Sequence, residues 1–390
     1  MIFAIPTAWL QLQYEKTRLL VAVLGIVFAV MIIFMQLGIR DALFDSAVRL
    51  HKSLDGDCFL ISPRSTSLIA MESFSERRLL QALALEEVEQ VSPVYLGYAQ
   101  WKNPKTKNYW RNIFVIGIDL RHQVSQAVGI QENLAKLQIP DTVLFDRNSR
   151  AEFGPIAADF ADEDRKVITE VGNQGNNRKI EVVGLFELGT SFGSDGNLLM
   201  SHSNFLRIFQ LRRAGFIDVG VIKLKKGYNA ELITQKLKNY LPPDVKVLAK
   251  PDFIHLEKNY WQTSTAIGFI FNLGVFLGLV VGLVVIYQIL YTNITEHLGE
   301  YATLKAMGYK DQYFLLIVLQ QSLAMAILGY LPGFLFSLIQ YSITKKFTLL
   351  PIEMSLERSF FVFFLTLGIS FISGTIALNK LKQADPADIF

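Results

Sequence analysis

The residue types that most often carry enzymatic chemistry are few and scattered in this sequence. Five histidines stand far apart, and no two share the spacing of a zinc-protease helix. A loop that cradles nucleotide phosphates needs glycines followed by Lys and then Ser or Thr, but the dipeptide Gly-Lys does not occur. We therefore expect no catalytic residue, no metal site and no cofactor in this chain.

One glycine-rich stretch, LGTSFGSDGN (residues 188–197), has residue types that could bind an anion. It lacks the lysine and the strand-to-helix setting of a phosphate loop. Its plain interpretation is a flexible loop between a strand and a helix. The only cysteine, Cys58, allows no intramolecular disulfide and indicates no particular compartment.

A more informative group of polar residues lies in NITEHLGEYATLKAMGYKDQYF (residues 293–314). Asn293 and Thr295 can cap a short helix, Gly308 suits the left-handed position that ends one, and Asp311 can begin the next. Such a helix presents apolar residues on one side and charged residues around it: Leu298, Tyr301, Leu304, Glu296, Glu300 and Lys305. From physics alone, an ordinary helix at a membrane surface is an alternative to a docking element.

Membrane helices must position the segment 293–314. Four stretches of 21, 37, 33 and 21 residues contain no Asp, Glu, Lys or Arg: Leu19–Ile39, Asn259–Thr295, Gln312–Thr344 and Ser359–Asn379. About 20 apolar residues in a helix cross a bilayer, and lipid leaves the backbone no partner outside the helix. We expect four transmembrane helices, the first an uncleaved anchor because no small-residue cleavage site follows it.

The segment between the first two spans, residues 40–258, has the composition of a soluble domain. It carries 29 Lys and Arg and 27 Asp and Glu in 219 residues, enough chain to bury its own core. No basic block suggests a nucleic-acid partner. Periodicity predicts strands at 112–120, 179–188 and 218–225, helices at 75–91 and 229–241, and a turn at 171–179. The predicted fold class is therefore a four-helix membrane protein with a large α+β extracytoplasmic domain inserted between helices 1 and 2.

The full predicted organisation has nine parts. It comprises an amphipathic helix (1–18), TM1 (19–39), an α+β domain with two subdomains (40–258), TM2 (265–290), a segment between spans (291–312), TM3 (313–341), a short loop (342–358), TM4 (359–379) and a C-terminal tail (380–390).

The spans carry their own structural signals. The excess length around the second span predicts one continuous helix reaching out of the bilayer, and Gly329, Pro332 and Gly333 predict a kink or break in the third. Three glycines share one face of the second span: Gly274, Gly278 and Gly282. They could form a homodimer seam or pack against another span of the same chain. We expect the uncharged polar residues of the spans to bond between helices: Gln36, Asn272, Gln288, Gln320 and Gln321.

Orientation is not settled by charge. With the N-terminus inside, six Lys or Arg near the spans lie on the inner side and eight on the outer side. The positive-inside rule would favour the opposite bias.

A family resemblance bears on these open points. EHLGEYATLKAMGY resembles the R-E-I-G-x-L-R-A-x-G signature of the FtsX/MacB-like permease family, through residues Glu296 or His297, Gly299, Glu300, Leu304, Lys305, Ala306 and Gly308. The C-terminal LNKLKQADPADIF is similar to that family's basic stretch and D-P-x-x-A-L ending. YEKTR before the first span, with Gly25 and Ile26 inside it, also resembles the family's start. Among subgroups, the chain is most similar to the DevC-type permeases of cyanobacteria.

The resemblance implies a permease subunit of a mechanotransmission (type VII) ABC exporter in the cell inner membrane. It would be a homodimer, bound to a separate ABC ATPase that holds ATP and Mg. Its periplasmic domain would dock a membrane fusion protein leading to a TolC-like outer-membrane channel. The ATPase-coupling residues would be Glu296, His297, Glu300, Tyr301, Leu304, Lys305, Met307 and Gly308. DevC-type relatives imply a lipid-like, glycolipid or other amphiphilic substrate.

Three other functions remain open at this point. An FtsX-like regulator of a periplasmic hydrolase shares the spans but has a much smaller domain. A lipoprotein-releasing permease has the same spans and a similarly large domain. A membrane-anchored sensor without an ATPase fits the coupling-type helix poorly. The spans carry no charged residue that could relay protons or ions, which argues against an ion-coupled carrier or channel.

Overall fold

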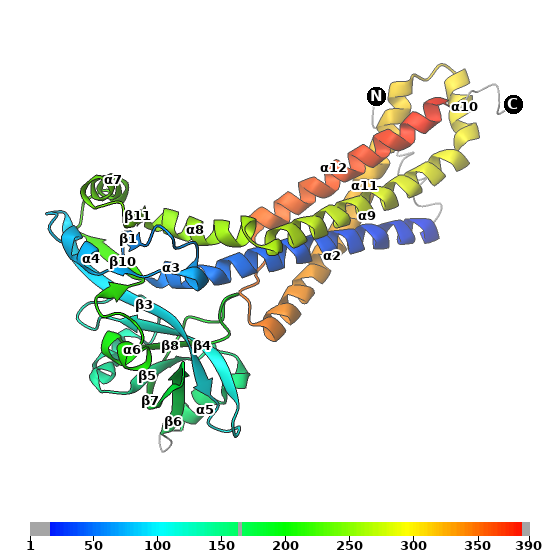
Figure 1. Cartoon of the computed structure of the whole chain (residues 1–390). Helices are drawn as coiled ribbons and strands as arrows, with labels where there is room; N and C mark the ends of the chain where they lie inside the picture. The colour runs from blue at the N-terminus through cyan, green and yellow to red at the C-terminus, as the bar shows by residue number, and fades with distance from the viewer. Residues whose placement is uncertain (1–15, 163–165, 384–390) are drawn as a thin grey trace. The chain divides into compact units, whose positions relative to one another are not determined.

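The structure is a computed structural model that describes residues 16–162 and 166–383 (Figure 1). The chain forms two compact units. We call residues up to Ala42, Ala266–Thr348 and the residues from Ile352 onward the membrane unit. Residues Leu43–Thr265, together with Leu349–Pro351, form the sheet domain. The amphipathic helix expected over residues 1–18 lies outside the described residues except for its last three, which belong to the first long helix.

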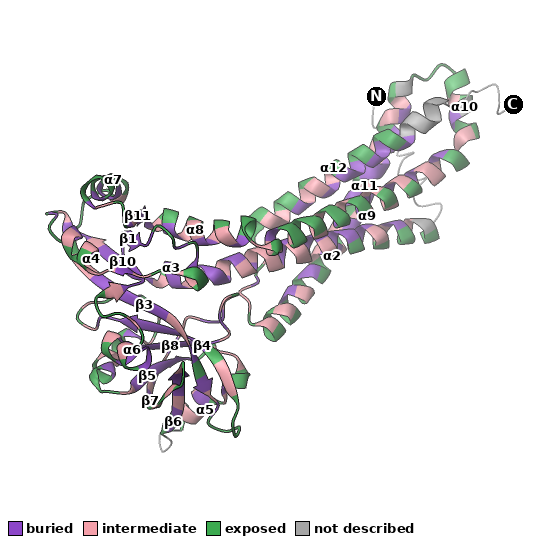
Figure 2. Cartoon of the chain, in the orientation of Figure 1, coloured by how far each residue is buried: buried purple, intermediate pink, exposed green. Residues whose placement is uncertain are grey.

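The described part of the membrane unit consists of helices joined by short connections. Its helices are α2 (Lys16–Ala47), α9 (Ala266–Glu296), α10 (Leu298–Ala306), α11 (Asp311–Thr348) and α12 (Leu356–Gln383). Four of them are long and apolar enough to cross a membrane, over Leu19–Ala47, Ala266–Glu296, Gln312–Thr348 and Leu356–Ala377. Large apolar side chains such as Phe276, Phe336 and Phe364 are exposed on these helices, as lipid-facing residues are (Figure 2).

Two expectations about the spans are wrong in detail. The second span is not one continuous helix, because α8 (Lys250–Thr263) ends before Ser264 and α9 begins at Ala266. The third span is not broken, because α11 continues through Pro332, and of the expected kink or break only the kink stays a prediction. A single helical proline removes one backbone donor without interrupting the turns on either side. The glycines beside it serve close packing instead: a Cβ on Gly329 or Gly333 would meet α2.

The sheet domain is built on one nine-stranded sheet in the order β11-β1-β10-β3-β4-β8-β5-β7-β6. Its longest strand, β3 (Val88–Lys102), pairs with β10 through its first half and with β4 through its second half. Near its end β3 also pairs with β6, at Gln100↔Gly172 and Trp101↔Val171. The strands β3, β4, β8, β5, β7 and β6 therefore close into a ring, and β11, β1 and β10 extend the sheet beyond it.

The remaining strands are all shorter than β3. They are β1 (Cys58–Ile61), β2 (Phe74–Ser75), β4 (Trp110–Ile118), β5 (Thr142–Asp146), β6 (Val167–Asn173), β7 (Asn176–Phe186), β8 (Asn197–Ser201), β9 (Phe216–Ile217), β10 (Val219–Leu224) and β11 (Lys246–Ala249). The helices of the domain are α3 (Arg49–Ser53), α4 (Arg77–Ala82), α5 (Ile156–Ala161), α6 (His202–Ile208), α7 (Ala230–Tyr240) and α8, with short 3₁₀ turns η1 (Leu68–Ala70), η2 (Gln131–Gln138) and η3 (Ala151–Phe153).

Local chemistry explains the elements that the sequence predicted well. The strands β4, β7 and β10 lie where β-branched alternation predicted them, and from Ile180 onward β7 alternates buried and half-buried residues. The predicted turn contains Gln174 and Gly175, both at positive φ, which suits a two-residue hairpin between β6 and β7. Helix α7 begins where expected, because the Asn229 side chain accepts the backbone N–H groups of Glu231 and Leu232.

The helix predicted over residues 75–91 is wrong beyond its first turns. Helix α4 ends at Ala82, and Val88 already belongs to β3. Val88 and Val91 pair with Leu224 and Ile222 of β10, so tertiary strand pairing outweighs the local helical propensity of these residues. The glycine-rich stretch also differs from its expectation, because it connects two strands, β7 and β8.

Candidate functional site

The segment between α9 and α11 forms a short helical connection at one end of the membrane unit (Figure 1). Helix α9 continues to Glu296, and His297 occupies the position before α10. The caps predicted at Asn293 and Thr295 are therefore wrong, because both residues lie inside α9. Gly308 has a φ of 95°, as expected for a left-handed residue that ends a helix, and α11 begins at Asp311 as predicted.

One side of α10 is anchored to the membrane unit. Tyr301 is only 3% exposed, and its ring meets Phe314 of α11 edge-on with ring centroids 5.5 Å apart. Leu298 and Leu304 are half-buried on the same helix. The expected apolar side of α10, formed by these three residues, is thus present and turned inward. Tyr301 fixes the rotation of α10 about its axis and serves as an anchor.

Residues around this buried side of α10 are open to solvent. Glu300, Lys305 and Met307 are exposed, Met307 with 63% of its surface accessible. Within this surface the His297 Nδ1 lies 3.2 Å from Glu300 Oε1. Of the eight residues predicted to couple to an ATPase, Glu296 ends α9, His297 precedes α10, Met307 follows it and Gly308 terminates the turn. We call Glu300, Thr303, Lys305 and Met307 the exposed face of α10.

The three glycines of the second span face α2 of the same chain. An added Cβ would lie 2.4 Å from Cδ of Gln36 at Gly274 and 2.9 Å from Cγ1 of Ile33 at Gly278. At Gly282 it would lie 3.3 Å from the Cβ of Ala29. The structure thus favours the intrachain alternative for this face, because small residues on α9 let α2 approach closely.

At the far end of the spans from α10, charged side chains link α2 to α12. Asp41 on α2 accepts hydrogen bonds from Nε and Nη2 of Arg358, at 3.2 and 2.9 Å. Arg358 also donates to the Tyr341 hydroxyl and to the Glu353 carbonyl, at 3.3 and 2.8 Å. Asp41 binds Arg40 as well, and Arg40 donates to Asn272 of α9 at 3.3 Å. These contacts join all four long helices at this end, and the Arg40–Asn272 bond bears out the expected role of Asn272 between helices.

Comparison with known protein families identifies the whole chain. Residues 19–240 match a family model described as the MacB-like periplasmic core domain, which is more than half of the chain. Residues 272–386 match a second model, described as the FtsX-like permease C-terminal. The chain belongs to the MacB/FtsX-like permease family. Comparison with curated proteins gives no match.

Two solved structures resemble part of the permease. The periplasmic region of MacB from Actinobacillus actinomycetemcomitans is 10% identical, covers 52% of this chain and 92% of its own, and has a TM-score of 0.35. The extracellular domain of the noncanonic ABC-type transporter YknZ from Gram-positive bacteria is 12% identical, covers 50% of this chain and 100% of its own, and has a TM-score of 0.33.

Family membership identifies the general function and the location of the chain. It is an ABC transporter permease of the inner membrane, with four membrane helices and the sheet domain in the periplasm. The family implies an ABC ATPase as a partner. The orientation that charge counting left open is thereby set, with α10 on the cytoplasmic side and the Asp41–Arg358 contact on the periplasmic side.

The connection between β7 and β8, residues 187–196, contains most of the glycine-rich stretch and is held by a buried carboxylate. We call this connection the glycine-rich loop. Asp146 accepts the backbone N–H of Gly189 and the side-chain amide of Asn197, both at 2.7 Å. Arg49 on α3 donates to the carbonyls of Leu188 and Thr190, at 3.4 and 3.1 Å. Burial raises the pKa of Asp146 above its ordinary value, while these hydrogen bonds act in the opposite direction. The carboxylate therefore has a structural role, and the loop is tied to α3.

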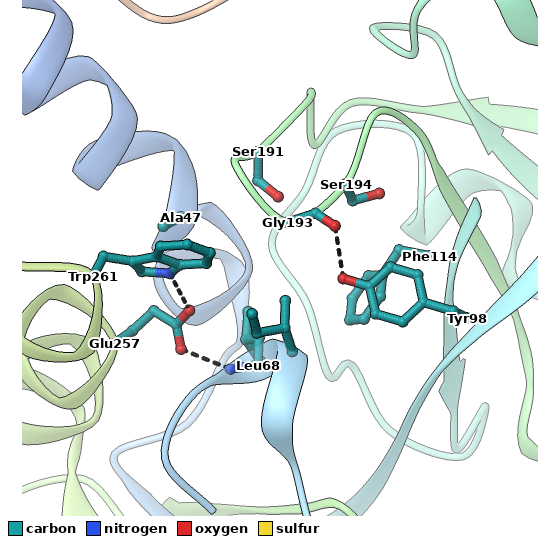
Figure 3. Close-up of a pocket in the computed structure, with 10 residues that line it drawn as sticks. Ala47, Leu68, Tyr98, Phe114, Ser191, Gly193, Ser194, Glu257 and Trp261 are labelled. Carbon is teal, nitrogen blue, oxygen red and sulfur yellow. Dashed lines mark hydrogen bonds between the residues drawn. The ribbon is translucent and has the colours of Figure 1, made fainter. Parts of the chain in front are cut away.

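A buried acid beside this loop escaped the sequence analysis. Glu257 on α8 is 2% exposed and lines a small cavity with Leu68, Tyr98, Gly193 and Trp261 (Figure 3). Its sequence neighbours, IHLEKNY, read as an ordinary exposed helix, so no local pattern marks it. The available signal was weak: apolar or aromatic residues recur at helical spacing around it, at Phe253 and Trp261.

Proposed function

We propose that this permease is the membrane subunit of an ATP-driven tripartite exporter. Two copies would form a homodimer, and each would bind an ABC ATPase through the exposed face of α10. ATP and Mg would be bound by that ATPase and not by this chain. The observation that carries the proposal is the geometry of α10: Tyr301 anchors one side to α11, while Glu300 and Met307 project from the other.

The anchored helix explains how force could enter the membrane unit. Tyr301 packs on Phe314, so a push on α10 acts directly on the first turns of α11. Helix α10 follows α9 with only His297 between them, so the same push acts on α9. A short helix with a buried aromatic anchor is suited to transmit displacement, because packed contacts resist compression.

The substrate would be lipid-like, a glycolipid or another amphiphile, collected on the periplasmic side. The four charge-free stretches contain no Asp, Glu, Lys, Arg or His that could line a polar path through the bilayer. An exporter that takes its cargo from the outer leaflet or the periplasm needs no such path. The periplasmic sheet domain would dock a membrane fusion protein, which leads to a TolC-like outer-membrane channel.

The first test is co-purification from the native host. The tagged permease is compared with the variant Glu300→Lys/Met307→Asp, and co-purified ABC ATPases are identified by mass spectrometry. The matched control is Glu231→Lys/Leu232→Asp, which makes the same charge changes on the exposed face of α7 in the sheet domain. We expect the ATPase with the wild type and the control, and at least a tenfold loss with the α10 variant. Equal recovery in all three would reject α10 as the docking element.

The same experiment separates the exporter from the regulator and the lipoprotein-releasing permease. A membrane fusion protein recovered after cross-linking in intact cells supports the tripartite exporter. A cell-wall hydrolase in its place supports a regulator, and a periplasmic chaperone carrying lipoprotein supports a releasing permease. Either of the latter two results would reject the tripartite assignment and leave ATPase docking intact.

A further inference from the structure

The side chain of Glu257 is an unusual acid in the sheet domain. Its Oε2 accepts the backbone N–H of Leu68 at 2.8 Å, and its Oε1 accepts the indole N–H of Trp261 at 2.8 Å (Figure 3). Removing a carboxylate from water disfavours its charged form. Burial accordingly raises the pKa of Glu257 from 4.5 to about 7, although both hydrogen bonds act to lower it. The acid therefore exists in both protonation states near neutral pH.

A second buried group lies beside it without a hydrogen bond. His51 on α3 is 1% exposed, and within the described residues neither of its ring nitrogens has a hydrogen-bond partner. Its Nε2 lies 3.7 Å from Oε2 of Glu257, which is too long for a hydrogen bond. Its ring rests on Phe253 with centroids 4.2 Å apart. Burial lowers the pKa of His51 to about 3, so the ring is neutral and one of its nitrogens is an acceptor.

The two groups complement each other when the acid carries a proton and the neutral ring of His51 keeps its own proton on Nδ1. A carboxylate has no proton to donate, and at 3.7 Å it is too far from Nε2 to accept a hydrogen bond from the ring. A protonated carboxyl has one O–H to donate, and Nε2 of His51 is an acceptor within a short movement of it. The neutral acid is also a weaker acceptor for the Leu68 N–H, because hydrogen bonds to charged groups are the stronger ones.

We propose that Glu257 and His51 form a proton-operated latch between α8 and the η1 turn of the sheet domain. With the carboxylate charged, Leu68 and Trp261 are held together through Glu257. When Glu257 takes a proton from solvent, its O–H turns to Nε2 of His51 and its hold on the Leu68 N–H weakens. The latch is closed at alkaline pH and loosened at acidic pH.

The surroundings of Glu257 have room for one water molecule and contain few other titratable groups. The cavity of about 20 Å³ beside Glu257 is large enough for one water. Tyr98 of β3 also faces it, but its hydroxyl donates to the Gly193 carbonyl at 2.7 Å, and burial raises its pKa to about 12. The other elements at the cavity contribute Ala47 of α2, Leu68 and Ile69 of η1, and Ser191, Gly193 and Ser194 of the loop, none of which titrates. Lys258, next along α8, binds Asp45 at 3.0 Å.

The consequence of the latch rests on the proposed function, because α8 is the element of the sheet domain that leads through Ser264 and Thr265 into α9. Trp261, in the last turn of α8, also meets Phe192 of the glycine-rich loop with ring centroids 4.7 Å apart. A closed latch holds α8 to both η1 and this loop. An open latch lets the residues before α9 move with less resistance from the domain.

The test uses the full-length permease in lipid nanodiscs, labelled with 5-fluorotryptophan. Fluorine NMR follows the Trp261 resonance, assigned through Trp261→Phe, between pH 5 and 9. We expect it to titrate with a midpoint near pH 7 and to become insensitive to pH in Glu257→Gln. Hydrogen exchange, corrected for its intrinsic pH dependence, should show weaker protection of the Leu68 amide at pH 6 than at pH 8 in the wild type only. A Trp261 resonance that does not titrate, or that titrates unchanged in Glu257→Gln, would overturn the proposal.

A second set of variants tests the role of His51. His51→Leu removes the acceptor for the protonated acid, so the midpoint should fall by roughly half to one pH unit, the equivalent of one hydrogen bond. His51→Gln restores an acceptor oxygen and should recover most of the shift. The control His202→Leu, at a histidine stacked on Tyr95 elsewhere in the domain, should leave the midpoint unchanged. A midpoint that stays or rises in His51→Leu would overturn the latch. None of these readouts involves the ATPase, so failure of α10 docking would leave them unaffected.

Discussion

The contact between α2 and α11 predicts that a single methyl group at Gly329 destabilises the membrane unit. An ideal Cβ at this position would lie 2.4 Å from Cγ2 and 2.5 Å from the Cβ of Ile26. Carbon atoms pack comfortably at roughly 3.5–4.0 Å. The Cβ of Ile26 is fixed to its backbone and cannot rotate away, so Gly329→Ala must separate the two helices.

The size of the effect follows from two opposing terms. Overpacking a well-packed contact costs about 1–3 kcal/mol. Replacing glycine by alanine within a helix returns about 0.4–1 kcal/mol by restricting the unfolded chain. The control is Gly368 in α12, where an added Cβ meets nothing within 4 Å. We therefore expect Gly329→Ala to be about 1–3 kcal/mol less stable than Gly368→Ala, which should match or exceed the wild type.

The assay is unfolding of the purified permease in mixed micelles by increasing sodium dodecyl sulfate, followed by circular dichroism of the helices. Ile26→Ala removes the Cγ2 contact but leaves the Cβ, so it should rescue Gly329→Ala only in part. Equal stability of the Gly329→Ala and Gly368→Ala variants would refute the close approach of α2 and α11.

Three further predictions concern titratable groups. Asp41→Asn removes the carboxylate that holds the Arg358 side chain, which is only 10% exposed, and should lower the free energy of unfolding by about 1–3 kcal/mol in the same assay. Breaking the exposed Lys345–Glu353 pair with Glu353→Gln should lower it by less than about 1 kcal/mol. Similar losses in the two variants would contradict this ranking. The folded-state pKa of Glu257 is raised from 4.5 to about 7, so its contribution to stability is present below pH 4.5 and lost as pH rises through 7. The melting temperature of Glu257→Gln, compared with that of the wild type, should therefore be higher at pH 8 than at pH 5. Differential scanning fluorimetry measures this difference. The pKa of His51 is lowered from 6.5 to about 3, so the stability that His51 contributes is lost as pH falls below 6.5. His51→Leu should abolish this loss of stability at low pH.

The sequence predicted the elements whose signals are local. The four charge-free stretches identify the membrane helices because lipid excludes charge over a fixed length. The cap at Asn229, the hairpin at Gln174 and Gly175, and the left-handed Gly308 each depend on one or two neighbouring residues. Such features follow from local chemistry and require no knowledge of the tertiary fold.

The features that were missed depend on contacts between distant parts of the chain. Val88 and Val91 belong to a strand only because β10 lies beside them, and β3 closes the ring of strands by reaching Val171. Glu257 and His51 lie far apart in sequence, and each reads alone as an exposed polar residue. For the three glycines of α9, the spacing predicted a packing face, and only the structure identifies α2 as its partner.

For the candidate site, the sequence predicted the position of α10 and its apolar side. It placed Tyr301 both on this apolar side and among the ATPase-coupling residues, whereas the structure shows Tyr301 buried and Met307 exposed. The rotation of a nine-residue helix depends on what it packs against, here Phe314 of the next helix. The role of the exposed face in binding an ATPase remains a prediction.

Site-specific photo-cross-linking tests the central claim most directly. A photoreactive amino acid replaces Met307, on the exposed face of α10, in the native host; Leu232, 71% exposed on α7 of the periplasmic domain, is the control position. The account predicts that irradiation joins the permease to an ABC ATPase from position 307 and not from position 232. No ATPase adduct at position 307, with the permease present at normal levels, would contradict docking through α10.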